Sequence, residues 1–319
     1  MVSENSVAIV MRTYERPIML ARALASVCQQ TYKNWTLTVV NNGGDPSRVD
    51  DVVNIARLGW PQAVIDVVHL RDRVGMEEAS NVALSQSHTD FFAIHDDDDS
   101  WKPTFLEKTV RAMQEQPDAV AVVCGVTRIH ELARGKTLRP QRAEAFYLDS
   151  HHLTFDGMIG NNTFPPIAAL FRRSLLDNIG MFDASLPVLG DWEFNLRALT
   201  QGQFFYLPER LANYHTRTPD SDVVAENSIT VGQDRHRVVK ERLIERWHSE
   251  RTPDGRNKGE VARTAYEMFE KYESERVARR LQPAESFVMR QKRRIVYAAQ
   301  HPRVGMRAVV RRVRQQVRK

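Results

Sequence analysis

The sequence is poor in cysteine and has no long apolar run. Cys28 and Cys124 lie in apolar, periodic segments, where they are typical of small core residues in a reducing compartment rather than of a disulfide framework. No stretch approaches the roughly 18 apolar residues that a membrane-spanning helix needs. The first residues lack the basic-then-apolar pattern of a signal peptide. We therefore expect a cytoplasmic protein.

Acidic residues are absent from the end of the chain. Residues 290–319 carry eleven Lys and Arg and no Asp or Glu. Removing these eleven from the 45 basic residues leaves 34 basic against 40 acidic residues. Although the whole chain has a net charge of +5, residues 1–289 therefore have a net charge of about −6. The basic character therefore belongs to the tail and not to the body of the protein.

Internal repeats and a nucleotide P-loop are also missing, but strand and helix patterns alternate clearly in the first half. The 319 residues, 42% of them apolar, suffice for one large α/β unit with an appendage. Strands are expected at 7–11, 35–40, 63–68 and 91–95, with helices after Arg16-Pro17, at 49–58 and at 76–87. Such alternation implies right-handed crossovers and a parallel sheet covered by helices.

The second half is less regular. Strand patterns occur at 120–124, 126–130, 167–171, 204–207 and 211–215, and helix patterns at 173–179, from Asp191, and from about Thr230 onward. We expect a polar excursion at 134–145 and a loop at 157–166, which is rich in Gly, Asn and Pro.

Four consecutive aspartates, Asp96 to Asp99, follow the apolar strand pattern at 91–95. Four like charges so close together repel, and a divalent cation such as Mg²⁺ or Mn²⁺ would offset them. The alternative is a solvated acidic turn or a helix cap. Polar loops at 12–16 and 41–45 also follow predicted strands, and ligands of such sheets bind at the carboxyl ends of strands.

Seven motifs follow one another in a fixed order: Val10–Pro17, Ser26–Tyr32, Val39–Gly44, Gly75–Asn81, Asp96–Trp101, Phe171–Asp183 and Gly190–Phe194. In this order and spacing the chain resembles the family 2 glycosyltransferases over residues 6–217. The resemblance implies the GT-A fold, an α/β, Rossmann-like, doubly wound mixed sheet. It places the catalytic domain at 1–228 and leaves 229–319 as a helical C-terminal extension with a basic tail.

The resemblance also implies a divalent metal, Mn²⁺ or Mg²⁺, on the aspartate cluster. Asp98 is then the main ligand, Asp96 contacts the ribose or the metal, and Asp99 lies beside them. Asp97 occupies the variable position and is expected to face solvent. His215, after the last strand of the domain, is a further candidate ligand, with a structural histidine as the alternative.

The nucleotide pocket implied by the resemblance is lined by polar side chains from the first three crossovers: Thr13, Tyr14, Glu15, Asn41, Asn42, Arg73 and Asn81. Asn41 replaces an aspartate that often faces the base. An amide both donates and accepts, so base pairing stays possible, but the assumption of uracil is weakened. The alternative for Asn81 is an ordinary polar residue of a helix.

The resemblance implies that Asp191 is the catalytic base. Direct displacement at the anomeric carbon needs a base, because the attacking hydroxyl must lose its proton. The family has an acidic pair here, and this chain has Gly190 in place of the first member. The alternative for Asp191 is a helix N-cap. Trp192 is either a platform for a sugar ring or a core residue, and 160–166 is a candidate acceptor-side loop.

The function expected from these residues is that of an inverting, metal-dependent glycosyltransferase. It would move a sugar from a nucleoside-diphosphate sugar to a glycan or lipid-linked acceptor, in the synthesis of a surface polysaccharide. One alternative is a nucleotidyltransferase of the same fold, although the loop 12–17 lacks the glycines that such enzymes use. Another is a non-catalytic sugar- or nucleotide-binding scaffold.

The basic tail has an apolar face at near-helical spacing, formed by Val304, Ala308, Val309, Val313 and Val317. A basic amphipathic stretch indicates contact with a partner or with the inner face of the cell membrane. A solvated tail is the alternative. No nucleic acid is expected, because the tail lacks interleaved aromatics and the body is acidic.

Overall fold

The computed structural model describes residues 5–135, 137–217, 233–272 and 274–275. The chain divides into two compact units, residues 1–265 and 266–319. The first unit holds all the named helices and strands, so it is described alone below. It extends beyond the boundary predicted at residue 228.

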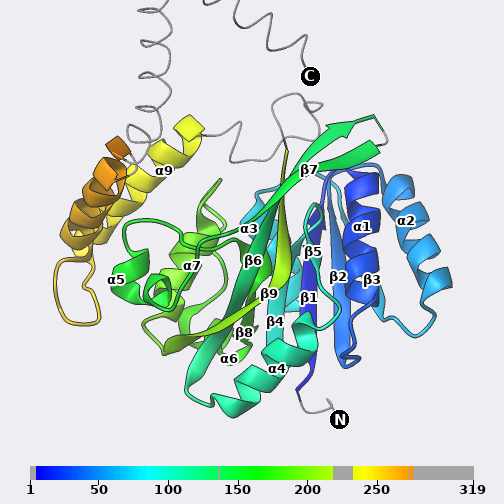
Figure 1. Cartoon of the computed structure of the whole chain (residues 1–319), viewed down its shortest axis with the longest axis horizontal. Helices are drawn as coiled ribbons and strands as arrows, with labels where there is room; N and C mark the ends of the chain where they lie inside the picture. Colours follow the sequence, from blue (N-terminus) through cyan, green and yellow to red (C-terminus); the bar gives the residue numbers. More distant parts are fainter. Residues whose placement is uncertain (1–4, 136, 218–232, 273, 276–319) are drawn as a thin grey trace, which may run out of the picture. The chain divides into compact units, whose positions relative to one another are not determined.

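A nine-stranded mixed sheet forms the centre of this unit, in the order β3-β2-β1-β4-β8-β6-β9-β5, with β7 paired to β6 (Figure 1). Its strands are β1 (Val7–Thr13), β2 (Trp35–Asn42), β3 (Ile65–Leu70), β4 (Phe91–Asp96), β5 (Ser100–Trp101), β6 (Ala119–Arg134), β7 (Thr137–Ala145), β8 (Ala169–Arg172) and β9 (Gln203–Arg217). The first four are parallel to one another. β8 is antiparallel to both β4 and β6.

The α-helices are α1 (Pro17–Cys28), α2 (Pro46–Gly59), α3 (Met76–Ser85), α4 (Phe105–Glu115), α5 (Phe155–Met158), α6 (Ser174–Ile179), α7 (Gly190–Ala198) and α9 (Gln233–Arg246). Short 3₁₀ turns occupy His151–Leu153, Pro166–Ala168 and Trp247–Ser249, and residues 258–272 are helical. Proline opens α1 and α2, because its fixed φ suits the first turn and its missing N–H is not needed there. The strands and helices predicted in the first half of the chain are confirmed.

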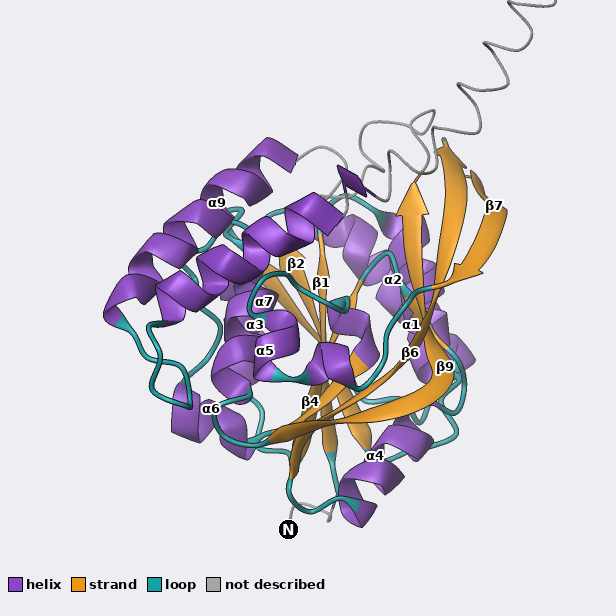
Figure 2. Cartoon of the chain, turned by 60° about the vertical axis from the view of Figure 1, so that its left-hand side comes forward, coloured by secondary structure: helices purple, strands orange, loops and turns teal. Residues whose placement is uncertain are grey.

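Two pairs of predicted strands are each one continuous strand. β6 and β9 run parallel to each other, with register shifts at Gly125 that carry the pairing through the irregular segment. In Figure 2 they curve together along the sheet. The predicted polar excursion is also a strand, since β7 pairs antiparallel with β6. Most β7 side chains are exposed, so no apolar alternation marked it in the sequence.

An aromatic cluster joins the central sheet to α7. Phe92 of β4 stacks on Phe171 of β8 with ring centroids 5.2 Å apart. Phe194 of α7 meets Phe171 edge-on at 5.6 Å. All three side chains are buried, and such aromatic pairs favour one defined geometry. The cluster therefore fixes α7, which carries Asp191, relative to β4, which carries the aspartates.

The segment after residue 232 packs on this same side of the first unit. Trp247 meets Trp192 edge-on at 5.1 Å, and the ammonium of Lys240 lies 5.3 Å from the Trp192 ring. Ala265 lies so close to Gly160 that an added Cβ there would be 2.8 Å from its carbonyl carbon. Burial of these groups explains why the compact unit continues past residue 228.

The predicted domain boundary and the basic tail both lie outside the described residues. In the part of the chain that is described, no helix is both long and apolar enough to cross a membrane.

Candidate active site

The three polar loops predicted at the ends of strands meet at one edge of the sheet. β1 lies between β2 and β4, so Arg12 is opposite Asp96 and Thr13 is opposite Asn41. The strands are parallel and their carboxyl ends coincide. The predicted juxtaposition of these loops is confirmed.

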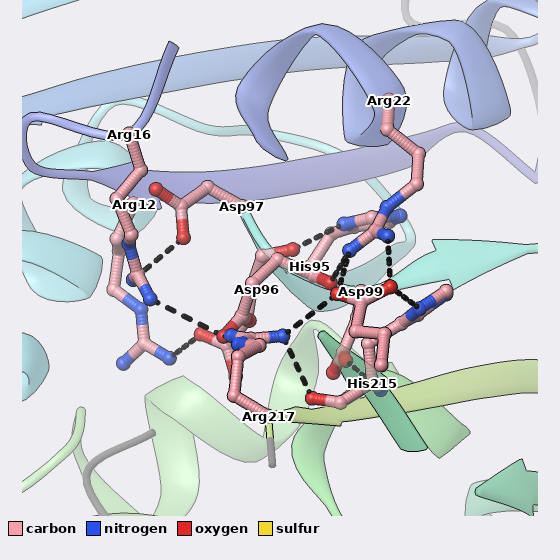
Figure 3. A network of polar contacts seen from close by, with 11 residues as sticks. Arg12, Arg16, Arg22, His95, Asp96, Asp97, Asp99, His215 and Arg217 are labelled. Atoms are coloured by element: carbon pink, nitrogen blue, oxygen red, sulfur yellow. Dashed lines mark hydrogen bonds and ion pairs between the residues drawn. The ribbon is translucent and has the colours of Figure 1, made fainter. Parts of the chain in front are cut away.

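Arginine side chains surround the four aspartates (Figure 3). Arg12 pairs with Asp96, its neighbour across the β1–β4 ladder. Arg16 lies 2.7 Å from Asp97 and 3.2 Å from Asp98. Asp98 also pairs with Arg217 at the end of β9. These guanidinium groups offset the repulsion among the four aspartates. From the sequence we expected a divalent metal ion in this role.

The buried carboxylate of Glu131, on β6, forms ion pairs with Arg22 and Arg217. It accepts from Arg22 at 2.8 Å, from Arg217 at 3.3 Å and lies 3.1 Å from Nδ1 of His215. Burial alone would raise the pKa of Glu131, but the hydrogen bonds from His215 and Arg22 lower it to about 2. Glu131 is therefore an anion that fixes Arg217, and through it Asp98.

Asp97 is completely buried, so the prediction that it faces solvent is wrong. No local pattern indicates this burial, because its partner Arg16 is distant along the chain. The pKa of Asp97 is raised to about 6, because burial and the charge of Asp98 together raise it by more than Arg16 lowers it.

His215 already uses both ring nitrogens. Nε2 lies 3.0 Å from the Ser100 hydroxyl, and Nδ1 lies 3.1 Å from Glu131. A ligand role for His215 therefore requires one of these contacts to break. The main-chain N–H of His215 donates to Oδ1 of Asp99 at 2.8 Å, which ties β9 to the aspartate loop.

The carboxylate oxygens of the cluster fit a hard divalent cation. Asp98 makes its ion pairs through Oδ2 and Asp96 through Oδ1. Oδ2 of Asp99 is buried and has no hydrogen-bond partner in the described part of the chain. Each residue thus retains an oxygen of the kind that Mg²⁺ and Mn²⁺ prefer. Within the described residues, no three acidic, histidine or cysteine side chains already converge as a complete metal cage.

The predicted nucleotide-binding side chains of the first crossover lie beside this cluster. The guanidinium of Arg73 lies 4.2 Å from the centre of the Tyr14 ring, a cation–π arrangement. Glu15 has a left-handed backbone, with φ of 53°, and accepts from the Asp45 N–H at 2.8 Å. Thr13 is buried at the end of β1.

Three asparagines predicted to bind the nucleotide also hold loops, and each one both donates to and accepts from the main chain of one residue. Asn41 bonds the main chain of Gly44, Asn42 that of Val74, and Asn81 that of Phe182. In this structure their amides position the loops around the site.

Asp191 lies in the first turn of α7. The N-cap position belongs to Leu189, which is left-handed with φ of 65°, so the N-cap alternative for Asp191 is wrong. Oδ2 accepts from Nδ2 of Asn162 at 2.6 Å. Burial raises the pKa of Asp191, Asn162 lowers it, Asp96 raises it and Arg12 lowers it. Gly190, the residue before Asp191, lies against Glu77 of α3, and Arg12 donates to the Met76 carbonyl of the same helix while it pairs with Asp96. These contacts link the start of α7 to the aspartate cluster.

The surroundings of Asp191 decide the open alternative for Trp192. Trp192 is fully buried and donates to the Met158 carbonyl at 2.8 Å, so it is a core residue and presents no surface to a sugar. Asn162 brings the predicted acceptor-side loop, 160–166, directly to Asp191. The acidic neighbour expected before Asp191 is absent from α7, but the carboxyl of Glu77 from α3 lies against Gly190.

Comparison with known proteins identifies the family. Residues 8–180 match glycosyl transferase family 2. The chain belongs to this family.

Curated relatives of this family 2 glycosyltransferase cover the same region. It is 29% identical to the "uncharacterized glycosyltransferase YwdF" of Bacillus subtilis (strain 168) over 192 residues, 60% of this chain and 67% of YwdF. It is 24% identical to an uncharacterized glycosyltransferase of Haemophilus influenzae over 197 residues, 62% of this chain and 63% of that protein. The match spans about two thirds of the length of these relatives.

Solved structures confirm the predicted GT-A fold. TarS 1-349 from S. aureus, in complex with UDP-GlcNAc, has a TM-score of 0.55 at 18% identity, over 74% of this chain and 65% of TarS 1-349. The mannosyltransferase PcManGT from Pyrobaculum calidifontis, in complex with GDP-Man and Mn²⁺, has a TM-score of 0.52 at 18% identity, over 75% and 61%. At this identity the likeness shows the fold alone.

Sequence reasoning missed several residues that build the site of this family 2 glycosyltransferase: Arg12, Arg16, Arg22, Glu77, Glu131, Asn162 and Arg217. Arg12 and Arg16 lay in a loop already noted as polar. Glu131 and Arg217 are direct partners across the β6–β9 ladder, but they are separated by 86 positions in the chain. No local pattern marks such a pair.

Proposed function

We propose that this protein is an inverting, metal-dependent glycosyltransferase. It takes a sugar from a nucleoside-diphosphate sugar and joins it to a hydroxyl group of a glycan or lipid-linked acceptor. The observation that carries the proposal is the series of contacts that runs from Asp96 through Arg12 to α3, and from Glu77 of α3 to Gly190, the residue before Asp191. It brings the candidate base to the edge of the sheet where the aspartate cluster lies. The complexes of TarS with UDP-GlcNAc and of PcManGT with GDP-Man and Mn²⁺ support the substrate class.

In this proposal Asp191 accepts the proton of the acceptor hydroxyl while that oxygen attacks the anomeric carbon. The bond from this carbon to the nucleoside diphosphate breaks as the new glycosidic bond forms, so the configuration inverts. Burial raises the pKa of Asp191, which makes its carboxylate a stronger base than one in water. Asn162 holds Oδ2 and leaves the carboxylate in one orientation.

The leaving diphosphate gains negative charge, and cationic groups at the strand ends would stabilise it. Arg16 and Arg217 reach the same carboxylate of Asp98 and supply positive charge there. Asp98 is the main candidate for holding a divalent cation, with Asp96 and Asp99 beside it. When bound, Mn²⁺ or Mg²⁺ would neutralise the charge of the departing diphosphate.

The experiment is an assay of the purified chain against a panel of UDP- and GDP-sugars, with Mn²⁺ or with EDTA, that measures released nucleoside diphosphate. We expect release with one donor, its loss in EDTA, and a product with the inverted anomeric configuration by NMR. Asp191→Asn should abolish release, whereas Asp177→Asn, at an exposed position of α6, should not. Formation of a nucleoside triphosphate and a sugar 1-phosphate when pyrophosphate is added to the donor would instead indicate a nucleotidyltransferase. Donor-induced thermal stabilisation without turnover would indicate a scaffold.

The proposal extends to a peripheral membrane contact through residues 290–319, whose basic composition suits an anionic surface. A chain ending at residue 289 tests this in sedimentation with vesicles of anionic lipid. We expect the full chain to sediment and the truncated chain to stay in solution. Equal binding by both chains would overturn the contact.

A further inference from the structure

The first turn of α7 has no room for a side chain at Gly190. A Cβ added there would lie 2.6 Å from Cδ of Glu77, and closer still to its Cγ and Oε1. Non-bonded carbon atoms prefer separations of about 3.5 Å or more. Glycine at this position is therefore what allows the Glu77 carboxyl to lie against the start of α7.

The Glu77 carboxyl comes from α3 and is buried. The residue is 4% exposed, and Oε2 has no hydrogen-bond partner among the described residues. The pKa of Glu77 is raised to about 7, because burial and the charge of Asp191 together raise it by more than Arg12 lowers it. A buried carboxyl oxygen without a partner is unusual in a native protein and destabilises the fold. Its position beside Asp191 gives a functional reason for it.

One cation serves three carboxyl groups here. Arg12 of β1 interacts with Asp96 of β4, with Glu77 of α3 and with Asp191 of α7. Its Nη1 also donates to the Met76 carbonyl, next to Glu77, at 3.3 Å. Loss of the Glu77 charge leaves Arg12 to the other two carboxylates. The charge on Glu77 and the proton affinity of Asp191 are therefore linked through both direct repulsion and Arg12.

We propose that Glu77 is a positioning residue for sugar transfer: its carboxyl occupies the space left by Gly190 and, with Arg12, sets the orientation and basicity of Asp191. This inference rests on the proposed function, because it takes Asp191 as the base. Glu77 touches no reacting atom and acts through Asp191 and Arg12. The second carboxyl of the site thus comes from α3 rather than from the residue before Asp191.

The first test compares Glu77→Gln with Glu78→Gln, which changes the exposed neighbour on α3. We expect Glu77→Gln to lower kcat at least about tenfold while the donor KM stays within about twofold. The pH profile of kcat should also lose its inflection between about pH 6 and 8, because the Glu77–Asp191 pair titrates together. Glu78→Gln should leave both unchanged.

The second test moves the carboxyl from α3 to α7. Gly190→Glu alone should lower both kcat and the melting temperature, because the new side chain clashes with Glu77. Glu77→Ala alone should lower kcat without that thermal loss. The double variant Glu77→Ala/Gly190→Glu should exceed each single variant in kcat by about tenfold. Glu77→Ala/Gly190→Ala relieves the clash without restoring a carboxyl, so it should remain slow.

The outcomes separate this inference from the function on which it rests. A wild-type chain that releases no nucleoside diphosphate from any donor overturns the proposed function, and this inference with it. If the wild type is active and Asp191→Asn is not, the function stands. In that case, a Glu77→Gln variant with wild-type kcat and pH profile, or a double variant no faster than Glu77→Ala/Gly190→Ala, overturns the inference alone.

Discussion

Nδ2 of Asn162 donates a hydrogen bond to Oδ2 of Asp191 over 2.6 Å. The two residues lie 29 positions apart, on the loop 160–166 and on α7. The other amide atom of Asn162, Oδ1, is buried and finds no hydrogen-bond partner among the residues that the structure describes. The bond therefore fixes the candidate base from the side on which an acceptor is expected to enter.

Asp191→Asn should lower kcat by about 10² to 10⁴, the usual contribution of a positioned general base. In the wild type, kcat should fall on the acid side with an apparent pKa above the ordinary aspartate value of about 4, because burial raises the pKa of Asp191 and the base works only when ionised. A kcat profile measured from pH 4 to pH 9 checks this. Unchanged turnover in Asp191→Asn would place the base elsewhere.

Asn162→Ala should lower kcat about tenfold, because the carboxylate loses the hydrogen bond that orients it. That bond lowers the pKa of Asp191, so its removal should move the acidic limb of the profile to higher pH. The control is Asn54→Ala on the exposed face of α2. An unshifted limb in Asn162→Ala would show that Asn162 does not act on Asp191.

Arg217→Met should destabilise the fold by about 3–5 kcal/mol, because it leaves buried anions without their partner. The Arg217 side chain is 1% exposed and pairs with Glu131, which is 0% exposed, and with Asp98. Urea unfolding measures the loss. Arg210→Met, at an exposed position of the same strand, should cost much less. Equal losses in the two variants would contradict a stabilising role for the buried network.

Glu77→Gln should be more stable than the wild type at pH 8, although we expect it to be slower. The unfolded chain releases the Glu77 proton near pH 4.3, whereas the folded chain keeps it to about pH 7. The folded state binds more protons between these values, so wild-type stability falls as pH rises through this window. Each pKa unit corresponds to about 1.4 kcal/mol, which gives an upper bound of a few kcal/mol at pH 8.

Thermal or urea unfolding of Glu77→Gln and the wild type at pH 4 and pH 8 measures this difference, with Glu78→Gln as the control. The advantage of Glu77→Gln should be present at pH 8 and vanish at pH 4. A variant that is less stable at both pH values would show that Glu77 serves the fold instead.

Asp98→Asn should weaken Mn²⁺ binding in the presence of a nucleoside diphosphate by about 10- to 100-fold. Burial alone would raise the pKa of Asp98, but Arg16 and Arg217 lower it, so Asp98 is an anion at neutral pH and the substitution removes a full charge. Isothermal titration calorimetry measures the affinity independently of turnover. Asp51→Asn, at an exposed position of α2, should bind Mn²⁺ like the wild type, and equal affinity in Asp98→Asn would move the metal to other ligands.

The sequence by itself determined the first four strands and the place of the candidate site. The alternation of strand patterns and helix patterns can be recognised from short segments of the sequence. Successive parallel strands then bring their carboxyl ends to one edge of the sheet. The polar loops at 12–16 and 96–99 therefore had to meet once the segments were recognised. The motif order from Val10 to Phe194 likewise sufficed to predict the family.

Only the tertiary structure decided which of these polar side chains face one another. Glu131 and Arg217 meet because β6 and β9 pair, and Glu77 reaches Gly190 because α3 packs against the start of α7. Trp192 is buried by Trp247 from a segment far along the chain. Contacts of this kind depend on long-range packing, and hydrophobic periodicity contains no information about which buried charges find one another.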